Sequence, residues 1–113
     1  MTSTASFVSQ WSFDVMDYEN WRRQLDDVLT VLQTTTGFET LTLLHSPDEP
    51  NRYQVQCRWV DVGSYRRGIS STNAKMTIWP FLASMIDGPS AFETLLVATE
   101  THSDEFETSV ENQ

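Results

Sequence analysis

The chain has 113 residues, of which 39% are hydrophobic and 12% aromatic, and its 7 basic and 16 acidic residues give a formal net charge of -9. This length predicts one domain with a single modest core, and the apolar content is too high for a disordered protein. The negative charge argues against nucleic acid as a partner, because phosphate backbones are bound by clustered basic side chains.

Residues 5–14 alternate in polarity, with Phe7, Trp11 and Phe13 on one face, which predicts a half-buried strand. A helix follows, and Asp17 is the residue expected to cap its N-terminus. Apolar residues then recur at helical spacing along one side, at Trp21, Leu25, Val28, Leu29 and Leu32. Gly37 is expected to end this helix.

A second strand is predicted over 38–46 and a third over 52–59, separated by the turn-forming residues 47–51. A short helix over 61–70 and a helical segment over 72–86 come next, the latter interrupted at Trp79-Pro80 because proline removes a helical hydrogen bond. Residues 90–99 predict a fourth strand.

The order of these elements predicts an α+β, ferredoxin-like split βαβ fold, with a four-stranded antiparallel sheet and the helices on one side. Apolar residues such as Leu41, Leu43, Leu95 and Val97 suggest that the second face of the sheet is also partly apolar. For so short a chain, the natural cover of that face is a second copy, which predicts a homodimer through the sheet face.

We expect residues 1–99 to form this domain and residues 100–113 to form a flexible acidic tail, since they hold five acids and no Lys or Arg. The one cysteine, Cys57, cannot form a disulfide within the chain. The N-terminus lacks the pattern of a secretion signal, and no apolar run is long enough to span a membrane. These features predict a cytoplasmic protein without a membrane partner.

Three stretches together resemble a known family: TGF at 36–38, RYQVQCRW at 52–59 and VDVGSYRRGISS at 60–71. From about residue 5 to 100, the chain is similar to the antibiotic biosynthesis monooxygenase (ABM) domain family. This resemblance implies a dimeric α/β barrel, in which two ferredoxin-like sheets pack face to face. It also implies a monooxygenase that uses O2 on a small aromatic, quinol or polyketide-like substrate, with no metal, flavin or haem as cofactor.

The resemblance places Trp59 at the mouth of a pocket between sheet and helices, with Tyr65 one helical turn further on. Trp59 and Tyr65 are therefore the candidate catalytic residues, and His45 is a weaker candidate as a general base because histidine is the residue type expected to titrate near neutral pH. The candidate ligand-binding residues are Trp11, Trp59, Asn73 and Trp79.

Each of these residues also has an explanation without chemistry. Large aromatic side chains at strand ends commonly pack in a core, Asn73 is suited to cap a helix, and a lone histidine beside a loop is commonly exposed. Val55 and Cys57 stand where a polar residue is expected in quinone-forming relatives. The alternative is therefore a non-catalytic module that binds a small ligand or a partner on the same dimeric barrel.

Haem degradation is disfavoured by two further positions. The haem-degrading branch of the superfamily has a second Trp and an iron-ligating His after the strand Trp, and Gly68 and Ile78 stand at those places here. The sequence also lacks paired Cys or His residues at metal-ligand spacing, which predicts no metal site.

Overall fold

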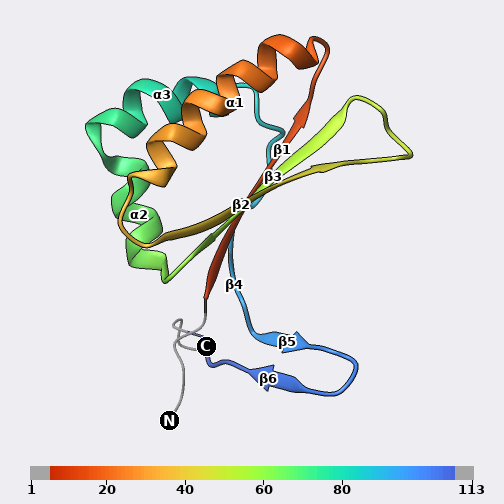
Figure 1. The fold of residues 1–113 in the computed structure, drawn as a ribbon, viewed down its shortest axis with the longest axis vertical. Coiled ribbons are helices and arrows are strands. Elements are labelled where there is room, and N and C mark those ends of the chain that lie inside the picture. Colours follow the sequence, from red (N-terminus) through yellow and green to blue (C-terminus); the bar gives the residue numbers. More distant parts are fainter. Residues whose placement is uncertain (1–5, 109–113) are drawn as a thin grey trace.

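The structure is a computed structural model that describes residues 6–108, and within this part of the chain it has three helices and six strands. In chain order they are β1 (Phe7–Asp14), α1 (Tyr18–Gln33), β2 (Phe38–His45), β3 (Arg52–Trp59), α2 (Val62–Ser70), α3 (Thr72–Leu82), β4 (Ala91–Glu93), β5 (Leu96–Ala98) and β6 (Ser103–Glu105). Strands β1 to β4 pair antiparallel in the order β2-β3-β1-β4, and the helices lie together on one side of this sheet (Figure 1). The predicted α+β, ferredoxin-like fold is confirmed.

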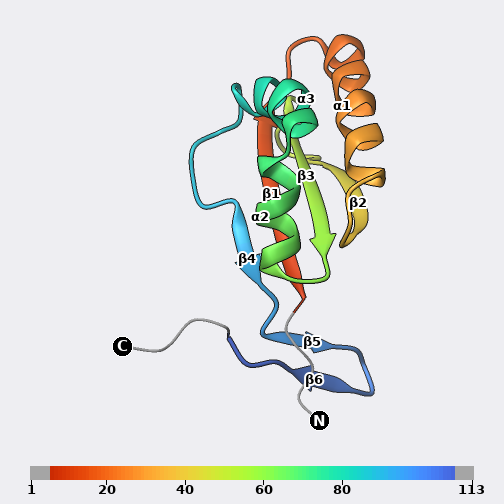
Figure 2. The ribbon, with the colours of Figure 1, turned by 90° about the vertical axis from the view of Figure 1, so that its left-hand side faces the viewer.

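The helix-facing side of the sheet forms the core. On β1 the side chains of Phe7, Trp11 and Phe13 are buried, and on β3 those of Val55 and Trp59 are buried. Period-two alternation sends these residues to one face, as predicted, because successive side chains of a strand point to opposite sides. The helices cover this face, and Figure 2 shows α2 and α3 in front of the sheet.

Helix α1 begins where predicted, because the Asp17 carboxylate accepts a hydrogen bond from the Asn20 amide at 3.1 Å. Its apolar stripe packs on the sheet with Trp21, Leu25 and Val28 buried. Helix α3 departs from the prediction, since it continues through Pro80 and ends at Leu82. Pro80 stands in the last turn, where its missing amide removes only one hydrogen bond from the helix.

The predicted fourth strand over 90–99 is wrong in extent, because it divides into two short strands in different sheets. Strand β4 pairs with the first residues of β1, and the Thr94 amide donates to the Ser6 carbonyl at 2.9 Å. Residues after Thr94 have no further described partner on this side, because β1 begins at Phe7 and the described residues begin at Ser6. The chain leaves the sheet there, and β5 pairs instead with β6.

The second face of the sheet, which we call the open face, is covered by no helix in residues 6–108 (Figures 1 and 2). Leu41 and Leu43 are not on it, contrary to the sequence-based expectation, because they pair with Cys57 and Val55 and pack on the core. A β-bulge between Phe38 and Thr40 shifts the register of β2 along β3.

The open face is mostly polar. Its centre is a row of hydrogen-bonded side chains, in which Gln56 donates to Gln54 at 2.8 Å and Gln54 donates to Ser12 at 3.1 Å. Apolar groups flank this row at Val8, which pairs with Arg58, and at Phe92, which pairs with Val8 from the other side.

Two predictions about the ends of the fold remain open. The division at residue 99 stays a prediction, and strand β6 lies within the stretch expected to be a tail, paired with β5 on the other side of that boundary. Residues 109–113 of the predicted tail lie outside the described residues. In the part of the chain that the structure describes, no helix is both long and apolar enough to span a membrane.

Candidate functional site

The centre of the candidate site is a buried aromatic cluster at the end of β3. Trp59, the last residue of that strand, pairs with Phe7 on β1 and packs edge-on against Phe38 and Tyr65, with ring centroids 5.5 and 5.6 Å apart. Tyr65 also contacts Phe7, with ring centroids 4.9 Å apart. The sequence-based pairing of Trp59 with Tyr65 is thus reproduced in space.

Two local features hold Tyr65 in this position. The Asp61 carboxylate caps α2 by accepting a hydrogen bond from the Ser64 amide at 2.8 Å, and this bond lowers the pKa of Asp61. Gly68 lies one turn further along α2, and a Cβ there would come within 3.0 Å of the Trp59 ring. The absence of a side chain at Gly68 therefore lets α2 lie directly against the indole.

Polar atoms inside the cluster are paired with one another. The Trp59 indole N–H donates to the Ser9 hydroxyl at 3.3 Å, and both residues are fully buried. Cys57 is the next inward-facing residue on β3, and its thiol also hydrogen-bonds Ser9. Burial raises the pKa of the Cys57 thiol to about 12, so it is neutral and unreactive at physiological pH.

Tyr65 is likewise a neutral group. Burial raises the pKa of its hydroxyl, and hydrogen bonds from Ser90 and Trp11 oppose that rise without cancelling it. The Tyr65 phenol can therefore donate or accept a hydrogen bond near neutral pH, but it does not serve as a base in its resting state.

A hollow of about 530 Å³ opens beside this cluster, between α2 and β4. Its aromatic and aliphatic walls come from Phe7, Val62, Tyr65, Phe92 and Leu95. Arg66 and Glu93 add one charge of each sign to the lining. This size and this mostly apolar lining with a few polar groups are typical of sites for small organic ligands.

Of the predicted site residues, Tyr65 lines this hollow, and Trp11, Trp59 and Trp79 do not. Trp11 and Trp59 are fully buried, and neither lines the hollow, whereas Tyr65, which is 8% exposed, does. The two indoles instead form the packed layer directly behind Tyr65. The ligand-binding and catalytic roles assigned to them stay predictions.

Asn73 and Trp79 lie elsewhere in the fold. Ser71, and not Asn73, caps α3, and Asn73 lines a separate hollow of about 360 Å³ together with Arg67 and Gly68. Trp79 is half exposed, and its indole N–H donates to the Ile69 carbonyl at 2.8 Å, which ties α3 to α2. The structure does not bring either residue to Tyr65.

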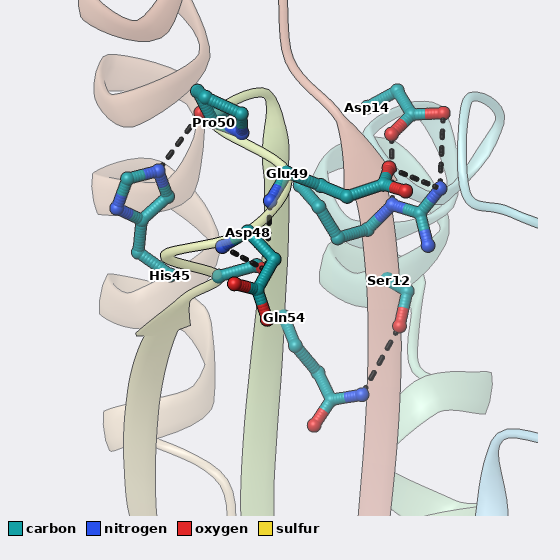
Figure 3. A network of polar contacts seen from close by, with 9 residues as sticks. Ser12, Asp14, His45, Asp48, Glu49, Pro50 and Gln54 are labelled. Carbon is teal, nitrogen blue, oxygen red and sulfur yellow. Dashed lines mark hydrogen bonds and ion pairs between the residues drawn. The ribbon is translucent and has the colours of Figure 1, made fainter.

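His45 lies at the opposite end of the sheet. It pairs with Tyr53, six residues before Trp59 on β3, which corresponds to about 20 Å along an extended strand. The exposed imidazole stacks on Tyr53 with ring centroids 4.4 Å apart, and its Nε2 lies 2.8 Å from the Pro50 carbonyl oxygen, beside the turn drawn in Figure 3. This position leaves His45 outside the hollow.

The structure adds lining residues that sequence reasoning missed, namely Phe7, Arg66, Phe92, Glu93 and Leu95. The sequence could have suggested Arg66 as a site residue, because it directly follows Tyr65 on a helix with a capped N-terminus. Phe92, Glu93 and Leu95 gave no such signal, because the path of the chain after β4 was not predicted. Among residues 6–108, no group of three or more His, Cys, Asp or Glu side chains is arranged to hold a metal ion.

Comparison with known proteins identifies the fold. No family model matches the sequence, and no curated protein does. Among solved structures, SnoaB, a cofactor-independent oxygenase from Streptomyces nogalater, is similar over 96% of this chain and 97% of its own, with a TM-score of 0.64 and 15% sequence identity. A putative antibiotic biosynthesis monooxygenase from Bordetella bronchiseptica is similar over 84% of this chain and 100% of its own, with a TM-score of 0.65 and 16% identity.

A third structure agrees with these two. A putative antibiotic biosynthesis monooxygenase from Caulobacter crescentus is similar over 82% of this chain and 91% of its own, with a TM-score of 0.63 and 14% identity. The chain therefore has the ferredoxin-like α+β fold of these three structures, one named as a cofactor-independent oxygenase and two as putative antibiotic biosynthesis monooxygenases.

Proposed function

We propose that this protein is a monooxygenase that needs no cofactor and oxidises a small aromatic, quinol or polyketide-like substrate with O2. The observation that carries the proposal is the hollow of about 530 Å³, which is walled by Phe7, Tyr65 and Phe92 and has one basic and one acidic residue in its lining. The fold likeness to a cofactor-independent oxygenase supports the same assignment.

The chemistry fits these surroundings because the substrate supplies the electrons. A phenol or anthrone that loses a proton becomes electron-rich enough to pass one electron to O2, and the two resulting radicals then combine. For an anthrone, the CH2 carbon gives up two hydrogens, one oxygen atom becomes the new carbonyl oxygen, and the other leaves as water. The apolar walls exclude water from the reactive intermediates.

The lining residues have distinct roles in this proposal. Arg66 attracts the anionic oxygen of the deprotonated substrate, which favours loss of the proton, and the Glu93 carboxylate is the proton acceptor. Tyr65 hydrogen-bonds a substrate oxygen through its neutral phenol, and Trp59 fixes the Tyr65 ring from behind. His45 has no part in this arrangement.

Oxygen uptake with a panel of hydroquinones and anthrones tests the proposal. We expect turnover by the wild-type protein and a loss of about a hundredfold or more in kcat for Glu93→Gln, which is the usual size of a general acid–base contribution. For Tyr65→Phe we expect a loss of about tenfold or more, because one hydrogen bond to the substrate is removed. Tyr53→Phe is the matched control, since it removes the same hydroxyl from a ring beside His45, away from the hollow. A wild-type protein that consumes no oxygen with any of these compounds contradicts the proposal.

A non-catalytic ligand-binding or interaction module is the second candidate. It is favoured by the protonated states of Cys57 and Tyr65 and by the apolar Val55, which leave the buried cluster without a base. Saturable binding of an anthrone, followed by quenching of tryptophan fluorescence, with no oxygen uptake supports the module. Binding together with uptake supports the enzyme.

We also propose that the protein is a homodimer in which the open faces of two copies meet. The row of Gln56, Gln54 and Ser12 supports this, because side-chain amides on a covered face can exchange hydrogen bonds across an interface. A cytoplasmic location is part of the proposal and is in keeping with the free, buried thiol of Cys57, since disulfides are typical of oxidising compartments.

A further inference from the structure

The chain that follows β6 returns to the hollow described above. The Phe106 amide donates to the Leu95 carbonyl at 3.0 Å, and Leu95 and Thr108 both belong to the lining of the hollow. Residues 95–105 are all exposed. Phe106 and Thr108 are partly buried, and Glu107 between them is exposed. The side chains on either side of Glu107 therefore face the molecule, and one of them reaches the candidate site.

The hydroxyl of Thr108 is hydrogen-bonded to the acidic group of the hollow. Its Oγ1 donates to Oε1 of Glu93 at 2.6 Å, and both residues are partly buried. A distance of about 2.5–2.7 Å is typical of a hydroxyl that donates to an ionised carboxylate, and such bonds are about twice as strong as those between neutral groups. The two residues are 15 apart in the sequence, with β5 and β6 between them. The bond therefore joins the returning chain to β4.

Glu93 is a flexible side chain on a short strand. It ends β4, which has three residues and lies at the edge of the sheet, where β1 is its neighbour. Because a glutamate side chain has several rotatable bonds, the position of the backbone alone does not fix its carboxylate. A general base has to stay within about 2.6–3.2 Å of the proton that it accepts. Among the described residues that line the hollow, Glu93 is the one carboxylate, so a restraint on it acts on the proton acceptor itself.

We propose that Thr108 is a positioning residue, which holds the Glu93 carboxylate in the orientation that accepts a proton from the substrate. This inference rests on the proposed function, in which Glu93 is the base and Arg66 attracts the substrate anion. Glu93 takes one proton from the substrate and later returns it to the oxygen that leaves as water. The Thr108 hydroxyl keeps its own proton throughout. Its hydrogen bond also favours the ionised form of Glu93, which is the form that accepts a proton.

Two substitutions in the full-length protein separate the hydroxyl of Thr108 from the shape of its side chain. Thr108→Val keeps the branched shape and removes the donor, whereas Thr108→Ser keeps the donor. In oxygen uptake with the hydroquinones and anthrones, we expect Thr108→Val to lower kcat by about tenfold or more with little change in KM, and Thr108→Ser to retain most of the activity. The acid limb of the kcat/KM profile moves to higher pH in Thr108→Val, because a carboxylate without its donor is protonated more readily.

Thr30→Val is the matched control for the loss of a threonine hydroxyl. Thr30 lies on α1, where its hydroxyl donates to the Asp26 carbonyl at 3.1 Å, and it is not part of the lining of the hollow. We expect kcat, KM and the pH profile of this variant to match those of the wild type. Circular dichroism of each variant verifies that the fold is retained.

A titration that needs no turnover gives an independent readout. Carbon-13 NMR of protein labelled at the glutamate side-chain carboxyl groups follows Glu93, whose resonance is identified by its loss in Glu93→Gln. We expect Thr108→Val to raise the titration midpoint of Glu93 by about one pH unit, which is the size expected when a carboxylate loses one hydrogen bond. Thr108→Ser and Thr30→Val leave the midpoint in place.

The failure of this inference is distinguishable from the failure of the proposed function. No oxygen uptake by the wild type contradicts the proposed function. A Glu93 midpoint that Thr108→Val leaves in place overturns the role of Thr108, whether or not the wild type is active. A lower kcat in Thr108→Val that Thr108→Ser does not rescue also overturns that role, because the loss then comes from the fold and not from the hydroxyl.

Discussion

At the scale of single residues, Gly68 determines how closely α2 approaches the sheet. A Cβ at this position would lie 2.8 Å from the Thr35 methyl group and 3.0 Å from the Trp59 ring. Alanine would raise helix propensity by about 1 kcal/mol, but overpacking a filled core typically costs about 1–3 kcal/mol. The steric cost is the larger of the two, because the indole of Trp59 is fully buried and has no room to move.

We therefore expect Gly68→Ala to lower the free energy of unfolding by about 1 kcal/mol, and Gly68→Val to lower it further. Urea denaturation followed by tryptophan fluorescence measures both changes. Gly63→Ala is the control within the same helix, because its Cβ would meet the flexible end of the Arg67 side chain at 3.0 Å and the Asp61 carboxylate at an ordinary contact distance of 3.5 Å. If Gly68→Ala proved as stable as Gly63→Ala, the close contact between α2 and Trp59 would be refuted.

At the scale of elements, the cap of α2 positions the residues that face the hollow. The Ser64 amide donates to the Asp61 carboxylate at 2.8 Å, and this hydrogen bond is the main reason why the pKa of Asp61 is lowered. Tyr65 and Arg66 follow within the first turn, so the direction in which α2 leaves β3 decides where both side chains lie.

This cap makes the stability of the fold depend on pH. A carboxylate whose pKa is lower in the folded than in the unfolded chain stabilises the fold fully above its unfolded pKa of about 3.9, and loses this contribution as the pH falls through the folded pKa. We expect Asp61→Asn to be less stable than the wild type at neutral pH, with a difference that shrinks as the pH falls below about 4.

Urea denaturation at a series of pH values measures this difference. Asp87→Asn is the control, because the Asp87 side chain forms no hydrogen bond with residues 6–108, and its effect should not follow the Asp61 profile. An Asp61→Asn effect of constant size from pH 7 to about pH 3 would argue against the ionised cap.

The same scale shows which elements could be predicted from the sequence. The faces of β1 and β3 follow from alternation, and the start of α1 follows from Asp17, because these signals are local. The end of β4 depends on where β1 begins, which is a pairing between segments more than 80 residues apart and leaves no mark in the local pattern. The same applies to Leu41 and Leu43, whose orientation depends on a bulge.

At the scale of the whole molecule, only part of the candidate site could be predicted. Trp59 and Tyr65 are close in sequence, and the turn between β3 and α2 brings them together. The other wall of the hollow comes from Phe92 and Leu95, whose position depends on the chain leaving the sheet after β4. His45 and Trp79 are candidate site residues because of their residue type. A residue type does not indicate which end of the sheet or which side of a helix the residue occupies.

The proposed dimer makes a prediction for the molecule as a whole, which is that its melting temperature depends on protein concentration. Association of folded copies draws the equilibrium away from the unfolded chain by mass action, so Tm rises with concentration for a dimer and stays constant for a monomer. We expect Tm to rise steadily between about 1 and 100 μM protein, and Arg58→Glu, on the open face, to reduce that slope.

Differential scanning calorimetry measures both the rise in Tm and its reduction, and Arg23→Glu is the charge-matched control on the helical layer. A Tm that is independent of concentration over this range, together with a monomeric mass by light scattering, would show that the open face remains in water and that its glutamine row hydrogen-bonds solvent.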